Sequence, residues 1–379
     1  MRMTACVVRE GGVPQPFAQS KPISVEEVEL CGPGASELLV KIGGAGLCHS
    51  DLSILNGDRS RGMPLVLGHE GAGEVMEVGD AIDDVAVGDH VVFQFSPSCG
   101  RCRRCLEGRP QICERAAVSR AKGQLLSGAH RLHDLDGNIL QHQSGVSCFA
   151  EYSVVHRGSV VVIDRSLPLH EAAIFGCAVM TGAGAVMNTA RIRAGDSVAI
   201  VGLGGVGLNG LLGATLAGAE TIVAVDLSDA KLGLARQLGA THTVNANDPD
   251  HLEQVRDLTG GGVDFAFDLA GTIKAMETAY DCACHGGSVV TAGLSPSGAK
   301  FSFEQGDLVG QEKSIRGSYM GSCVPVRDIP RFIRLYQQGR FPVDRLIDRT
   351  IGFDEVNAGF DKLQNNTTVR QICVPHGAQ

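Results

Sequence analysis

Three distant points of the chain carry side chains that bind transition metals. They are Cys48, in the segment Gly-Leu-Cys-His-Ser-Asp at 46–51, and two later donors, His69 and Cys177. One histidine and two cysteines are a ligand set used by catalytic zinc, which keeps a fourth position open for water or substrate. Spacing alone does not join such distant residues, so three unrelated buried side chains are the competing interpretation.

The residues beside Cys48 and His69 favour the metal site. A metal-bound histidine normally donates its other ring N–H to a carboxylate, and Asp51 is a candidate for that partner. Glu70 directly follows His69 and is either a nearby charge or an occasional ligand. Ser50 is placed to accept the proton of a zinc-bound alcohol, so the segment predicts alcohol or carbonyl chemistry.

A second metal site is predicted where four cysteines crowd into one short segment: Cys99, Cys102, Cys105 and Cys113. Four thiolates can close a tetrahedron around one zinc ion, and such a closed site has a structural role. Free cysteines or disulfides are one alternative. An iron–sulfur cluster is another, although its usual cysteine spacings differ.

A nucleotide site is predicted where a glycine-rich turn joins a strand, 197–201, to a helix that reaches about residue 217. The turn residues are Gly202, Gly204, Gly205, Val206 and Gly207. This pattern lets a pyrophosphate approach the N-terminus of the helix. Asp226 ends the next predicted strand, where a carboxylate binds the ribose hydroxyls and repels a 2′-phosphate. We therefore expect NAD rather than NADP.

The segments around these motifs predict an α/β protein with two domains. Short strands and turns, such as 4–8 and 37–42, continue to about residue 165 and predict a β-rich domain. Strands then alternate with helices to about residue 320, which predicts a doubly wound parallel sheet. Ser228 is expected to cap a helix over 227–238.

Composition narrows the classes of function. The chain has 379 residues and a formal charge of −9, which argues against a nucleic-acid-binding protein. Residues 1–10 lack the apolar core of a signal peptide, and polar residues interrupt the apolar stretch 198–225, so no membrane partner is expected. Thirteen cysteines without a secretion signal predict a reducing, cytoplasmic location.

Taken together, the motifs resemble those of the zinc-dependent medium-chain alcohol dehydrogenases of the long, two-zinc type. The matching segments are GLCHSD at 46–51, GHEGAG at 68–73, VGD at 87–89, the four-cysteine segment, FGC at 175–177, GLGGVG at 202–207, VD at 225–226 and VRQI at 369–372. The resemblance implies a discontinuous GroES-like catalytic domain, 1–178 and 322–379. It also implies an NAD-binding Rossmann domain, 179–321.

The resemblance also implies roles for single residues and two zinc ions per subunit. Ser50 matches the hydroxyl that takes the alcohol proton, and the cofactor contacts are His49 and Arg370 for the pyrophosphate and Asp226 and Lys231 for the adenosine ribose. Phe95 matches a residue of the substrate channel, and Leu294 lies near the nicotinamide and the substrate. The implied assembly is a homodimer or a homotetramer.

Two departures from the family pattern leave alternatives open. Ser53 stands where the proton relay usually ends in a histidine, so water or His49 is the alternative acceptor. Ala117 stands where thiol-dependent formaldehyde dehydrogenases carry an arginine, with Arg115 two positions away. The expected function is reversible hydride transfer from a primary or secondary alcohol to NAD. The alternatives are oxidation of an S-hydroxymethyl thiol and, more distantly, a non-catalytic NAD-binding protein.

Overall fold

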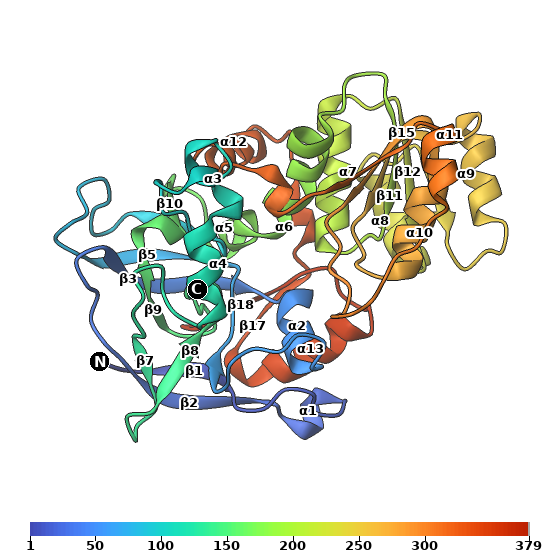
Figure 1. Ribbon diagram of the computed structural model, residues 1–379. Helices are drawn as coiled ribbons and strands as arrows, with labels where there is room; N and C mark the ends of the chain where they lie inside the picture. Colours follow the sequence, from blue (N-terminus) through green and yellow to red (C-terminus); the bar gives the residue numbers. More distant parts are fainter. Residues whose placement is uncertain (378–379) are drawn as a thin grey trace. The chain divides into compact units, whose positions relative to one another are not determined.

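The computed structural model describes residues 1–377 and divides the chain into two compact units. Unit 1 takes Met1–Cys177, Val324–Arg331 and the C-terminal stretch from Ile347, so it contains both chain ends (Figure 1). Unit 2 takes Ala178–Cys323 and Phe332–Leu346. Residues 322–379 are all predicted to belong to the first domain, whereas this division places Phe332–Leu346 in unit 2.

Unit 1 is built from a closed barrel, β1-β2-β7-β8-β4, and a seven-stranded sheet in the order β10-β6-β5-β3-β18-β17, with β9 paired to β3. These strands are β1 (Arg2–Val8), β2 (Ile23–Leu30), β3 (Glu37–Gly46), β4 (Leu65–Val66), β5 (Gly71–Val78), β6 (His90–Phe93), β7 (Leu132–His133), β8 (Ile139–His142), β9 (Tyr152–His156), β10 (Val160–Ile163), β17 (Arg349–Ile351) and β18 (Gln371–Cys373). Near its C-terminus the chain returns to the first domain segment, since Ile372 pairs with Gly46.

The core of unit 1 follows the two-residue period of its strands. In β1, Met3, Ala5 and Val7 pack into one apolar cluster, whereas Cys6 and Val8 pack into another on the opposite face. Short helices connect the strands: α1 (Phe17–Ser20), α2 (His49–Leu55), α3 (Arg103–Leu106), α4 (Glu114–Ala121), α5 (Leu169–Ala172) and α13 (Val356–Gln364). The predicted β-rich character of this part of the chain is confirmed.

Unit 2 is a six-stranded parallel sheet in the order β13-β12-β11-β14-β15-β16 with helices on both faces (Figure 1). Its strands are β11 (Ser197–Val201), β12 (Thr221–Asp226), β13 (His242–Asn245), β14 (Val263–Asp268), β15 (Ala283–Thr291) and β16 (Ser314–Gly317). Its helices are α6 (Ala178–Gly184), α7 (Gly205–Ala217), α8 (Asp229–Gln237), α9 (His251–Thr259), α10 (Ile273–Cys282) and α11 (Gln305–Gly310), while α12 (Pro325–Gln337) runs from unit 1 into unit 2. The predicted doubly wound sheet is confirmed.

Ser228 occupies the N-cap position of α8, as predicted, but its side chain makes no capping hydrogen bond. Its backbone N–H instead donates to the Asp226 carboxylate at 2.9 Å. The carboxylate that ends β12 therefore holds the backbone of the residue that directly precedes α8.

Among residues 1–377, no single helix is long and apolar enough to cross a membrane. The bent pair Leu169–Gly176 and Ala178–Ala190 reaches the required length and composition only when its two helices are taken together.

Candidate active site

Unit 1 brings Cys48, His69 and Cys177 together in its interior. Cys48 is the N-cap residue of α2, directly after β3, and His69 lies between β4 and β5. Their ligand atoms and the Cys177 sulfur all lie within 4.8 Å of one another, and all three residues are buried. Cys177 Sγ lies 3.6 Å from His69 Nε2. A buried cluster of two sulfurs and one imidazole nitrogen fits zinc.

Asp51 fixes the orientation of the His69 ring. Its carboxylate is fully buried on the first turn of α2, and its Oδ1 lies 3.0 Å from His69 Nδ1. The other ring nitrogen, Nε2, is thereby directed to the sulfurs. Gln143 donates to the same Oδ1 at 2.6 Å. Sequence reasoning missed Gln143, because no motif marks an amide 92 residues from its partner.

The charges in this cluster support a thiolate at Cys48. A hydrogen bond from the Cys177 thiol, followed by the charge of His69, holds the pKa of Cys48 well below its usual value. The same hydrogen bond and burial raise the pKa of Cys177. Burial opposes the charged form of His69, but the negative charges of Asp51 and Cys48 outweigh it and raise the pKa of His69. Cys48 therefore supplies the negative charge of the cluster, while His69 and Cys177 would release protons on binding a metal ion.

Glu70 forms a buried ion pair behind this cluster. Arg370 Nη1 lies 3.0 Å from Glu70 Oε2 and donates to the Leu47 carbonyl at 2.8 Å. Burial raises the pKa of Glu70 to about 7, although the charge of Arg370 opposes that rise. Glu70 is not among the clustered ligand atoms. In this arrangement the Arg370 guanidinium is held inside unit 1, and its predicted pyrophosphate contact stays a prediction.

The remaining predicted residues of unit 1 lie around the same cluster. His49 and Ser50 are the first two residues of α2, with His49 exposed and Ser50 half-buried. Ser53 donates its hydroxyl to the His49 carbonyl at 2.8 Å, one turn earlier on the same helix. The Phe95 ring meets the His69 ring edge-on, with 5.4 Å between the ring centroids. Phe95 therefore flanks His69, and its place in a substrate channel stays a prediction.

The four-cysteine segment forms a second compact donor set in unit 1. Its four sulfurs lie within 4.8 Å of one another, and Cys102 Sγ is 3.5 Å from Cys105 Sγ. The backbone N–H of Cys105 is the main cause that lowers the pKa of Cys102 to about 6. Burial raises the pKa of Cys105 to about 12. Four sulfurs in this arrangement fit one tetrahedral zinc ion and leave no position for a substrate.

In unit 2 the glycine-rich turn adopts the geometry expected for phosphate binding. Gly202 has φ +90°, which favours glycine, and a Cβ on Gly207 would lie 1.7 Å from the Gly202 carbonyl oxygen. Gly204 is the N-cap of α7, which begins with Gly205 and Val206. The turn therefore presents a helix N-terminus, with its unpaired N–H groups, to an anion.

Asp226 is attached to this turn. Its Oδ2 accepts the Leu203 N–H at 2.6 Å, so the carboxylate stands beside the turn as well as at the end of β12. Lys231 is buried on α8, the helix that follows. Leu294 is 52% exposed in the segment after β15. The predicted cofactor residues of unit 2 are thus distributed along the carboxyl ends of β11, β12 and β15.

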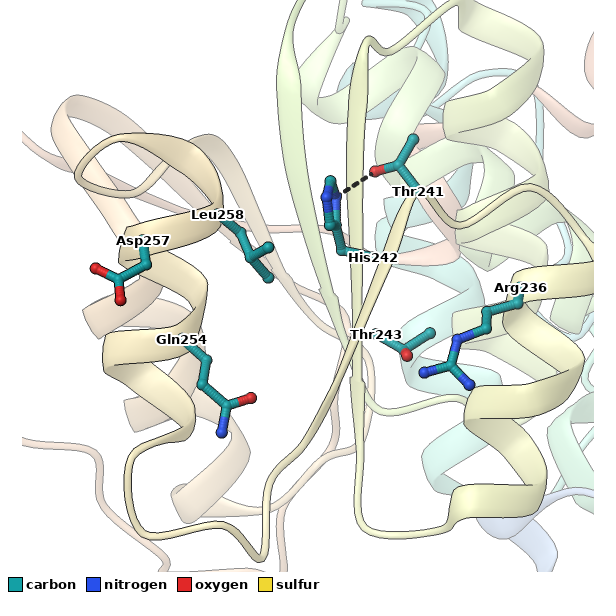
Figure 2. Close-up of a pocket in the computed structure, with 7 residues that line it drawn as sticks. All are labelled: Arg236, Thr241, His242, Thr243, Gln254, Asp257 and Leu258. Atoms are coloured by element: carbon teal, nitrogen blue, oxygen red, sulfur yellow. Dashed lines mark hydrogen bonds between the residues drawn. The ribbon is translucent and has the colours of Figure 1, made fainter.

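A separate pocket of about 500 Å³ lies beside the edge strand β13, between α8 and α9 (Figure 2). Its lining residues are Arg236, Thr241, His242, Thr243, Gln254, Asp257 and Leu258. None of these residues belongs to the predicted metal or nucleotide sites. The pocket therefore contributes nothing to the predicted chemistry.

Comparison with known proteins identifies the family. The family model described as "Alcohol dehydrogenase GroES-like domain" matches residues 34–165, and "Zinc-binding dehydrogenase" matches residues 205–338. An S-(hydroxymethyl)glutathione dehydrogenase of Paracoccus denitrificans is 35% identical, over 98% of this chain and 99% of the relative. An alcohol dehydrogenase class-3 of Cereibacter sphaeroides is also 35% identical, over 99% of this chain and 100% of the relative.

Solved structures agree with this result. An alcohol dehydrogenase zinc-binding domain protein of Burkholderia ambifaria has a TM-score of 0.92 at 34% identity, covering 99% of both chains. Benzyl alcohol dehydrogenase of Acinetobacter calcoaceticus has a TM-score of 0.88 at 32% identity, again covering 99% of both chains. A zinc-binding dehydrogenase structure from Sinorhizobium meliloti 1021, bound to NADP, has a TM-score of 0.79 at 30% identity, covering 99% of this chain and 100% of that one.

Both halves of the chain match, and the relatives align over almost its whole length. Cys48, His69 and the four clustered cysteines lie within the first matched region, while Cys177 and the start of the glycine-rich turn lie between the two matched regions. The chain therefore belongs to the zinc-dependent medium-chain alcohol dehydrogenases, and it is an NAD-dependent oxidoreductase of that family with two zinc-binding sites.

Proposed function

We propose that the chain is an alcohol dehydrogenase that reversibly oxidises a primary or secondary alcohol to an aldehyde or ketone with NAD. One observation carries the proposal: the buried convergence of Cys48, His69 and Cys177, with Asp51 behind the histidine. Zinc held by these residues would lower the pKa of an alcohol, and NAD would accept the hydride. The intact ligand set argues against a non-catalytic NAD-binding protein.

Residues of unit 1 transfer the alcohol proton and line the substrate channel. Ser50 takes the alcohol proton, and His49, exposed at the start of the same helix, is available as the next acceptor in the place of the family's histidine at position 53. Ser53 donates its hydroxyl hydrogen to the His49 carbonyl, and a neutral serine hydroxyl is too weak a base to hold the proton as a histidine would. Phe95 lines the substrate channel beside His69.

The cofactor roles follow the same family pattern. Asp226 and Lys231 bind the adenosine ribose, while the turn from Gly202 to Gly207 receives the pyrophosphate. His49 and Arg370 are the proposed pyrophosphate contacts from unit 1, and Leu294 is the proposed neighbour of the nicotinamide. The same proposal includes the discontinuous catalytic domain, with its boundaries at 178 and 322. It also includes assembly into a homodimer or a homotetramer. Light scattering of the purified chain tests the assembly.

Oxidation of an S-hydroxymethyl thiol is the second candidate, because relatives in Paracoccus denitrificans and Saccharomyces cerevisiae are named for that activity. The substrate arginine of that branch is replaced by Ala117, which is exposed on α4. Arg115 does not restore it, because residues two apart on a helix do not face the same direction. The residues of α4 therefore favour an alcohol that carries no charged thiol adduct.

A substrate panel separates these two candidates. Aliphatic, aromatic and terpenoid alcohols are assayed with NAD, beside formaldehyde with and without added glutathione. We expect turnover of at least one alcohol class, and no increase in the formaldehyde rate when glutathione is added. A large increase that depends on the thiol would replace the alcohol proposal by the thiol-dependent one. No turnover of any substrate by a zinc-loaded sample would contradict both.

Replacement of Asp226 by glycine is expected to relax the choice of cofactor. Removal of the carboxylate removes its repulsion of a 2′-phosphate, so we expect the kcat/KM ratio of NADP to NAD to rise by about 100-fold. Asp226 also holds the Leu203 N–H, and loss of that contact should weaken the binding of both cofactors, so the comparison uses the ratio. The measurement is kcat/KM with each cofactor at one saturating alcohol concentration.

The matched control is Asp229→Asn, three residues further along. Asp229 is an exposed carboxylate at the start of α8 that accepts a hydrogen bond from the Asn245 side chain at 2.8 Å. Its loss should leave the cofactor ratio unchanged. If the unaltered enzyme already prefers NADP, the proposed role of Asp226 is wrong.

A further inference from the structure

Two carboxylates flank the glycine-rich turn symmetrically. β11 lies between β12 and β14, and the turn follows its last residue, Val201. Asp226 ends β12 on one side and Asp268 ends β14 on the other. Asp226 binds the backbone of the turn directly through Leu203. Asp268 has no role in the proposed cofactor site.

Asp268 holds two backbone segments at the carboxyl edge of the sheet. Its Oδ1 accepts the N–H groups of Ala270 and Gly271, each at 3.2 Å. Its Oδ2 accepts the Thr291 hydroxyl at 2.8 Å, at the end of the neighbouring strand β15. The backbone carbonyl of Asp268 also accepts the Gly293 N–H at 3.2 Å. One residue, 2% exposed, therefore ties the turn after β14 to the segment after β15.

These two segments pack against the nucleotide turn and Leu294 without spare room. A Cβ placed on Gly202 would lie 2.6 Å from the Ala270 Cβ, and one on Gly271 would lie 2.9 Å from the Leu294 backbone nitrogen. Because not even a methyl group would fit at either glycine, a shift of the turn after β14 is expected to displace Gly202 and the Leu294 backbone. A change at Asp268 is therefore transmitted to both Gly202 and Leu294.

We propose that Asp268 is a positioning residue for NAD(H), which keeps the edge of the sheet beside the Gly202 turn in the shape that binds the cofactor. The inference rests on the proposed function, because it assumes that NAD(H) binds at this edge. Asp268 acts through Ala270, Gly271 and Thr291 and does not itself need to touch the cofactor. A purely structural role, in which Asp268 only stabilises unit 2, is the alternative.

The test measures NADH binding directly, without any alcohol. The full-length, zinc-loaded chain is titrated with NADH by calorimetry or by NADH emission, and the melting temperature of each variant is recorded. The chain contains no tryptophan, so NADH emission is read without a tryptophan background. We expect Asp268→Ala to raise the Kd for NADH by about tenfold, because three hydrogen bonds to the carboxylate are lost. Asp268→Asn should recover most of that loss, since its amide oxygen can still accept the Ala270 and Gly271 N–H groups.

The matched control is Asp264→Ala, at the other end of the same strand. Asp264 Oδ2 accepts the backbone N–H and the hydroxyl of Ser197, at the start of β11. Its loss removes comparable hydrogen bonds far from the nucleotide turn, so it should lower the melting temperature but leave the Kd unchanged. If Asp268→Ala does not fold, Thr291→Val replaces it as the test, with an expected rise in Kd of about threefold.

The outcomes distinguish this inference from the proposed function. An unchanged Kd in folded Asp268→Ala, or in Thr291→Val where the alanine variant is unfolded, overturns the inference alone. An equal rise of the Kd for NADH in Asp264→Ala and Asp268→Ala also overturns the inference. Both carboxylates would then affect NADH binding only through the stability of unit 2. If the unaltered chain does not bind NADH, the cofactor assignment and the inference fail together.

Discussion

Replacement of Cys48 by serine is expected to abolish alcohol oxidation while leaving a folded chain that still binds NADH. The serine oxygen is a poor substitute for a thiolate ligand, and the other two donors, His69 and Cys177, do not complete a zinc site alone. Without the Lewis acid the alcohol keeps its high pKa, so we expect kcat/KM to fall by about 1,000-fold or more. The measurements are the rate with the best alcohol of the panel, the zinc content, expected to fall from two ions per chain to one, and the Kd for NADH.

The control for this variant is Cys148→Ala. Cys148 is also a fully buried cysteine of unit 1, but its sulfur belongs to neither group of metal ligands in the described residues. Removal of that sulfur should lower stability by about 1 kcal/mol and leave two zinc ions and normal turnover. Undiminished turnover by Cys48→Ser that holds one zinc ion would contradict the catalytic assignment of this site.

The fold of unit 2 could be predicted closely because its signals are local. The structure places β11 at Ser197–Val201 and β12 at Thr221–Asp226, the bounds that the sequence pattern predicts. A buried parallel strand is a short apolar run, and the glycines of the intervening turn mark where it ends. Strand ends without such a mark were predicted less well: β3 continues to Gly46, beyond the predicted end at 42, because its last residues pair with β5 and β18.

Contacts between distant residues were not predictable in the same way. The donors Cys48, His69 and Cys177 lie up to 129 positions apart, so only the resemblance to a family, and then the fold, joined them. Gln143 could not be found at all, because a single amide carries no spacing signal. Asp268 did carry a usable signal: like Asp226, it is a carboxylate at the end of an apolar strand. Its proposed positioning role could not be predicted from the sequence, because that role depends on the packing of Ala270 against Gly202.

The two metal clusters should respond differently to loss of a ligand. The segments that carry Cys48 and His69 are also held by contacts that need no metal. Gln143 donates to Asp51 beside Cys48, and Arg370 donates to Glu70 beside His69. The four-cysteine segment consists of a loop with only the short helix α3 and a 3₁₀ turn inside it. We therefore expect the first cluster to govern turnover and the second to govern stability.

Replacement of Cys102 by serine is accordingly expected to lower the melting temperature by about 5–10 °C, with a smaller effect on turnover at low temperature. Cys102 Sγ lies 3.5 Å from the sulfur of Cys105 and 3.8 Å from that of Cys113. Loss of its thiolate leaves only three ligands, so the zinc ion should be lost. The loop depends on that ion for stability, because it has no apolar core of its own. Calorimetry and zinc analysis of the same sample check the result.

Cys31→Ser is the appropriate control, because Cys31 is an exposed cysteine of unit 1 whose sulfur is 3.7 Å from His133 and belongs to neither ligand group. It should keep two zinc ions and an unchanged melting temperature. If Cys102→Ser loses one zinc ion and still melts at the temperature of the unaltered chain, the metal of this cluster does not stabilise the fold. Since a closed four-sulfur site offers no position for substrate, the segment would then need a function outside the reaction, such as a partner contact, to explain why four cysteines converge there.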